Sequence, residues 1–159
     1  MDKETLKKFM TEAIDLSLAG VKNDAGGPFG AIIVKDNVII GRGHNRVTST
    51  NDPTAHAEVV AIRNACNHLH SFQLDGCILF TSCEPCPMCL GAIYWSRLQK
   101  IYYGCNRNDA AAIGFDDEFI YTEIGKPITD RKIEMEQLCR ADALQAFKNW
   151  DNKSDKIKY

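Results

Sequence analysis

Hydrophobic residues in the first third of the chain change their spacing once. Between residues 5 and 20 they recur every three or four positions, which predicts an amphipathic helix. Residues 29–34 and 38–43 are instead apolar at consecutive positions, which is typical of strands that are covered on both faces of a sheet. The short polar segment 35–37 between them predicts a hairpin.

Helical and strand patterns then alternate along the rest of the chain. The expected elements are a helix over about 55–69, a strand over 77–81, a helix over 87 to about 96, a strand over 100–104 and a helix over 141–150. Such alternation predicts an α/β domain of three layers, with helices on both faces of the sheet. The length of 159 residues predicts one domain, 1–159, with a core of ordinary size.

Composition excludes several classes of protein. Nineteen basic and twenty-one acidic residues give a net charge of −2, which argues against a general nucleic-acid binder. No apolar run approaches the ~20 residues that a membrane helix needs. No apolar segment of a signal peptide follows the charged start, and the seven cysteines form no regular disulfide framework. We therefore expect a cytoplasmic protein that does not bind membranes.

Candidate metal-binding residues are concentrated in the sequence Ser-Cys-Glu-Pro-Cys-Pro-Met-Cys, residues 82–89. Pro87 suits the first turn of a helix, and Cys86 and Cys89 would then project from one face of it. The positive end of the helix dipole favours thiolates there. Two thiolates so placed provide half of a zinc site.

The best candidate for a third ligand is His56, which stands two residues before Glu58. Three protein ligands leave one tetrahedral position open for water, as in catalytic zinc sites. A bound zinc ion lowers the pKa of that water, and Glu58 is well placed to carry its proton. Two alternatives remain at this point: a purely structural zinc site, and a closed site in which Cys83 is the fourth ligand.

The other cysteines and histidines have simpler interpretations. Cys66, Cys77, Cys105 and Cys139 are expected to be small core residues. We expect His68 and His70 at the surface near the end of a helix, and His44 packed on the sheet.

The paired motifs resemble those of the zinc-dependent cytidine and nucleobase deaminase superfamily, which share His-x-Glu and Pro-Cys-x-x-Cys. Within it the chain is most similar to bacterial guanine deaminases, nearly from end to end. The similarity runs through 26–31, 51–58, 82–93, 114–117 and 158–159. The Gly-Phe-Asp-Asp sequence at 114–117 and the terminal tyrosine narrow the resemblance to guanine deaminases.

The resemblance implies a cytidine-deaminase-like fold with a central mixed sheet, one zinc ion per subunit, and a homodimer. The C-terminal segment, about 140–159, would be exchanged between subunits. The residues implied to bind the substrate are Phe29, Asn45, Ala57, Trp95, Asp117 and Tyr159. Asn45 would hydrogen-bond a small purine base, Phe29 would pack on it, and Asp117, rather than Asp116, would accept its N–H groups. Trp95 would wall the site, and Tyr159 would reach the partner's pocket.

The implied reaction is hydrolysis of guanine to xanthine and ammonia, with Glu58 as the proton carrier. Three alternatives stay open: a guanosine deaminase, a tRNA adenosine deaminase, and a zinc-stabilised binding module without activity. A tRNA enzyme should gather basic residues near the site, whereas residues 134–155 mix both signs. A structural module has no use for Glu58 beside an open metal position. Cytosine and cytidine fit residues 114–117 less well.

Overall fold

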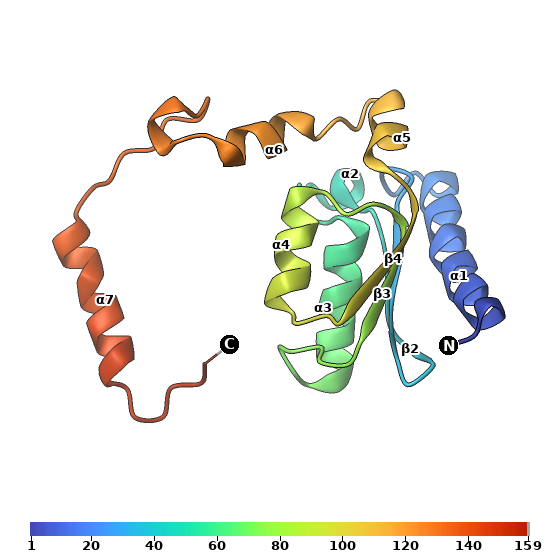
Figure 1. Ribbon diagram of the computed structural model, residues 1–159, viewed down its shortest axis with the longest axis horizontal. Coiled ribbons are helices and arrows are strands. Elements are labelled where there is room, and N and C mark those ends of the chain that lie inside the picture. The colour runs from blue at the N-terminus through green and yellow to red at the C-terminus, as the bar shows by residue number, and fades with distance from the viewer. Residues whose placement is uncertain (159) are drawn as a thin grey trace. The chain divides into compact units, whose positions relative to one another are not determined.

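The computed structural model describes residues 1–158 (Figure 1). The chain forms two compact units, the first over Met1–Asp117 and the second from Glu118 onward. The first unit contains α1 (Lys3–Lys22), β1 (Gly30–Lys35), β2 (Val38–His44), α2 (Val47–Thr50), α3 (Ala57–Leu69), β3 (Ile78–Cys83), α4 (Pro87–Trp95), β4 (Lys100–Cys105) and α5 (Arg107–Ala112). The second contains α6 (Glu118–Gly125), a 3-10 turn (Ile128–Asp130) and α7 (Arg140–Asn152).

The four strands form one sheet in the order β2-β1-β3-β4. The β1–β2 and β1–β3 pairs are antiparallel and the β3–β4 pair is parallel, so the sheet is mixed, as expected. The predicted hairpin joins β1 to β2. Its turn residues Asp36 and Asn37 have φ angles of 48° and 62°, which suit the two-residue turn whose twist matches that of the flanking strands.

Helices cover both faces of the sheet, which confirms the three-layer prediction (Figure 1). Alternate residues of β1 enter different cores. Ile32 and Val34 pack with Phe9 and Ala13 of α1, whereas Ile33 packs with residues of α3. This alternation explains why the strand is apolar at consecutive positions.

A close approach between β2 and α3 places the first turn of that helix. A Cβ added at Gly43 would lie 2.2 Å from the carbonyl oxygen of Ala57, so only glycine allows this spacing. The start of α3 is therefore held against the sheet, directly after the segment that carries His56.

The sequence patterns left some elements unpredicted. Neither α5 nor α6 was expected, although Asn106 and Asp109 form a capping box at the start of α5. In the second unit, α6 and α7 have no buried residue. The assignment of the chain to a single domain stays a prediction. Among the described residues, no helix has the length and apolar character needed to span a bilayer.

Candidate active site

Two helix starts supply the candidate metal ligands. His56 is the N-cap of α3, and Cys86 is the N-cap of α4 with Pro87 directly after it. Both caps have extended backbone, and neither side chain caps its own helix. Cys89 lies in the first turn of α4 and is fully buried. The imidazole and the two thiols are therefore free of local helix bonds and can bind a common ion.

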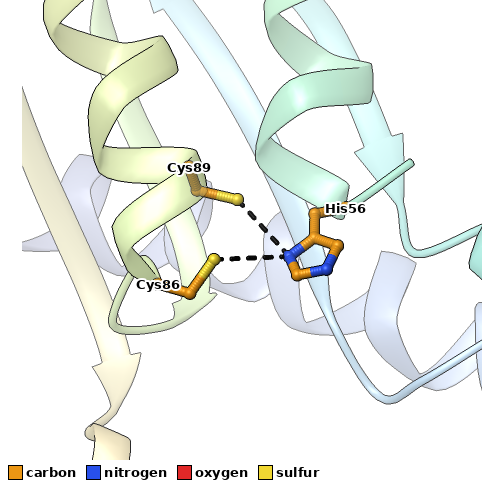
Figure 2. Close-up of side chains that lie close together, drawn as sticks. All are labelled: His56, Cys86 and Cys89. Atoms are coloured by element: carbon orange, nitrogen blue, oxygen red, sulfur yellow. Dashed lines mark hydrogen bonds between the residues drawn. The ribbon is translucent and has the colours of Figure 1, made fainter. Parts of the chain in front are cut away.

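The three side chains face one another (Figure 2). The Nδ1 atom of His56 lies 3.5 Å from the sulfur of Cys86 and 3.5 Å from that of Cys89. Zn–S bonds of about 2.3 Å and Zn–N bonds of about 2.0 Å at tetrahedral angles place sulfur and nitrogen about 3.5 Å apart. The donor set and its spacing thus fit one zinc ion.

The described residues offer this site three ligands and no more. Cys83, the alternative fourth ligand, ends β3 and directs its thiol to the carbonyl oxygen of Asn106 at 3.6 Å. Burial raises the pKa of the Cys83 thiol to about 11, so it stays protonated at neutral pH. The arrangement is therefore that of a site with an open position.

The two thiols shift each other's pKa in opposite directions. A hydrogen bond from Cys89, assisted by His56, lowers the pKa of Cys86 to about 4, while the same contact with Cys86 raises the pKa of Cys89. One sulfur is thus a ready thiolate, and a metal ion would displace the proton from the other.

Glu58 lies in the first turn of α3 and is buried beside the ligands. Its Oε2 accepts a hydrogen bond from the Cys89 thiol at 3.4 Å, and its Oε1 accepts one from the Thr81 hydroxyl at 3.4 Å. Burial raises the pKa of the Glu58 carboxyl. A carboxylate that gains a proton readily, next to an open metal position, can act as a general base and then as a general acid.

A cavity of about 450 Å³ opens over these groups. Its lining includes His56, Cys86 and Glu58, and also the predicted substrate residues Phe29, Asn45 and Asp117. This volume is in the range of small-molecule sites.

Asn45 is nearly fully buried and held in one orientation. Its Oδ1 accepts hydrogen bonds from the backbone N–H groups of Gly27 at 3.2 Å and Val47 at 3.1 Å. A Cβ at Gly26 would lie 2.3 Å from this oxygen, so the glycine makes room for the amide. Because the oxygen is committed to the backbone, the Nδ2 group remains as the donor for a ligand.

The opposite wall comes from the loop after α5. The Phe115 ring meets that of Phe29 edge to face, with centroids 4.9 Å apart. Asp116 and Asp117 also line the cavity, and partial burial raises the pKa of Asp117. Thr81 and Phe115 were not predicted as site residues. Phe115 could have been found, since it stands within the Gly-Phe-Asp-Asp motif.

Other predicted positions lie elsewhere. Trp95 is 64% exposed at the far end of α4 and is not part of the described cavity lining, and Ala57 is buried at the start of α3. Their contacts with substrate stay predictions. Tyr159 lies outside the described residues.

The cysteine prediction was partly wrong. Cys105 and Cys139 are exposed, whereas Cys77 is buried and Cys66 half-buried. The histidines are placed as predicted: His68 and His70 are exposed at the end of α3, and His44 lies half-buried on β2.

Comparisons with known proteins agree with this geometry. The cytidine and deoxycytidylate deaminase zinc-binding region matches residues 3–105. The guanine deaminase of Bacillus subtilis is 54% identical over the full length of both chains. Its crystal structure matches with a TM-score of 0.94 at 53% identity, covering 100% of this chain and 99% of that one. The tRNA-specific adenosine deaminase of Aquifex aeolicus is 49% identical over 76 residues, 48% of this chain and 50% of its own. The chain belongs to the deaminase family defined by this cytidine and deoxycytidylate deaminase zinc-binding region.

Proposed function

We propose that this protein deaminates guanine to xanthine and ammonia with one zinc ion at His56, Cys86 and Cys89. The observation that carries the proposal is the buried Glu58 carboxylate beside a three-ligand site at the floor of a cavity. The full-length similarity to a guanine deaminase supports the same substrate. A bound zinc ion would make hydroxide available from water near neutral pH.

Each residue of the cavity has a separate role in this reaction. Glu58 takes one proton from the attacking water and passes it to a ring nitrogen; it then takes the remaining proton from the new hydroxyl group on C2 and passes it to the exocyclic amine. A bond forms between the water oxygen and C2, and the bond from C2 to the amine breaks, which releases ammonia. The Nδ2 of Asn45 donates to the base, and Asp117 accepts from its N–H groups. Phe29 and Phe115 provide an aromatic wall for the purine.

Ammonia release from a panel of substrates tests this function. The purified, zinc-loaded protein is incubated separately with guanine, guanosine, cytosine, cytidine and adenine. We expect turnover of guanine alone. Turnover of guanosine instead would move the assignment to a nucleoside deaminase. If none of the five reacts, tRNA is tested next, and its deamination would favour the family's RNA branch. Inactivity toward all of them would favour a zinc-stabilised binding module.

Replacing Asn45 by aspartate separates two roles of this side chain: accepting hydrogen bonds from the backbone and donating one to the base. Aspartate still accepts from the N–H groups of Gly27 and Val47, but it offers no donor to the base. We expect KM for guanine to rise at least about tenfold, as loss of one buried hydrogen bond predicts. Steady-state kinetics measure this, and circular dichroism checks the fold. An unchanged KM would rule out donation by Asn45.

A homodimer with exchanged C-terminal segments is the second part of the proposal. In support, α7 has no buried residue within one chain, and Phe147 and Leu138 are exposed. Helix α4 is apolar nearly all round, with Tyr94 and Trp95 exposed. Such surfaces need a partner. Light scattering during size exclusion should give twice the 17.8 kDa mass of the chain. A monomer at micromolar concentration would contradict the exchange.

We also propose that the protein is located in the cytoplasm. In support, all seven cysteines are free of disulfides, which is typical of proteins in a reducing compartment.

A further inference from the structure

The segment that joins β3 to the metal-binding helix also holds the start of α5. The backbone N–H of Glu84 donates to the carbonyl oxygen of Cys105 at 2.9 Å. The Oε2 atom of Glu84 accepts from the backbone N–H of Arg107, the first residue of α5, at 3.1 Å. The Cys83 thiol adds a bond to the carbonyl oxygen of Asn106 at 3.6 Å. We call these three hydrogen bonds the α5 clamp.

The clamp matters because α5 has no buried residue. Burial of its own side chains therefore does little to set its position, and contacts at its two ends must do so. At the far end, the N–H of Phe115 donates to the carbonyl oxygen of Ala110 at 3.0 Å, which holds the loop to α5 itself, and the Phe115 ring packs on Phe29, just before β1, which ties this end to the sheet. A short helix tied at both ends carries Asp117 into the cavity wall.

We propose that Glu84 is a positioning residue for substrate binding. Its side chain is the part of the clamp that reaches the helix itself, and both Glu84 and Arg107 line the cavity. Since Glu84 stands two residues before Cys86, it joins the metal-binding segment to the segment that carries Asp117. Glu84 thereby sets the distance between the metal-binding cysteines and Asp117, the residue proposed to accept hydrogen bonds from the base. This inference rests on the proposed function and adds a residue to it.

The role requires an acceptor rather than a charge. Glutamine at position 84 still presents an oxygen to the N–H of Arg107, whereas alanine presents none. A positioning role therefore predicts that Glu84→Gln is close to wild type and that Glu84→Ala is not. Loss of a carboxylate needed for proton transfer would impair both variants equally.

A matched control is available on the same helix. Asp109 accepts from the N–H of Asn106 at 2.9 Å in the capping box of α5, and it is not part of the described cavity lining. Asp109→Ala also removes one carboxylate-to-backbone bond, yet it leaves the bond between Glu84 and Arg107 in place. This control variant therefore separates the effect of a weakened α5 helix from the effect of losing the contact that positions α5 against the metal-binding segment.

The experiment combines amide hydrogen exchange with steady-state kinetics on the full-length, zinc-loaded protein. In Glu84→Ala we expect the Arg107 amide to exchange about tenfold faster, and KM for guanine to rise about tenfold with kcat within about threefold. Glu84→Gln and Asp109→Ala should keep KM within about twofold of wild type, and zinc content should be equal in all variants.

Three outcomes would overturn the inference: unchanged exchange at Arg107 in Glu84→Ala, a loss of kcat instead of a rise in KM, or an equal rise in KM in Asp109→Ala. If wild-type protein left guanine unchanged, the proposed function would fail, while the exchange measurement would still decide whether the clamp exists.

Discussion

Replacing Glu58 by glutamine is expected to lower kcat for guanine by about 10²–10⁴-fold, the range that general acid–base groups contribute. Glutamine keeps the size of the side chain and can still bond Thr81 and Cys89, but it cannot take a proton from water. The unfolding temperature should not fall, since a neutral amide is easier to bury than a carboxylate. Ammonia release and thermal unfolding measure the two effects.

The control for this variant is Glu12→Gln. Glu12 pairs with Arg42 at 3.7 Å on the surface, where such pairs contribute little. Its substitution should leave turnover unchanged. Near wild-type activity in Glu58→Gln, with zinc bound, would refute the assignment of Glu58 as the proton carrier and return the site to a structural role.

Removal of the metal is the second change with a large expected effect. Treatment with a zinc chelator should abolish guanine turnover, and added Zn²⁺ should restore it. The unfolding temperature should fall as well, because an ion that binds only the folded protein stabilises it by about 2.7 kcal/mol at a hundred times its Kd. For a chain of this size that corresponds to about 5–10 °C. Calorimetry and metal analysis follow the loss and the recovery.

Cysteine variants test whether zinc binding and activity depend on the proposed ligands. Cys86→Ser keeps the side-chain size but replaces a thiolate that zinc prefers, so bound zinc and activity should both fall sharply. Cys105→Ser changes an exposed thiol outside the cluster and should retain both. If Cys86→Ser bound zinc as wild type does, the ligand set would be wrong.

Local patterns were enough to predict most of the first unit. The strands β1 and β3 are apolar at consecutive positions because each of their faces meets a helix, and the alternation of helices and strands reflects that layering. The missed helix α5 shows the limit of such patterns. It spans six residues with no apolar period, and a capping box is its main local signal. The exposed Cys105 and Cys139 were misjudged because residue type alone does not determine burial.

Local spacing was sufficient to predict the candidate zinc ligands and the proton carrier. The spacing of Cys86 and Cys89 in one helical turn, and of Glu58 two residues after His56, is a local property that any fold beginning helices there would preserve. The arrangement of the cavity around the predicted substrate depends instead on the tertiary structure. The hydrogen bond that orients Asn45 joins it to Gly27, 18 residues away in sequence. The bond between Glu84 and Arg107 joins residues 23 positions apart. Such contacts depend on how the sheet brings its ends together, and no local pattern records that.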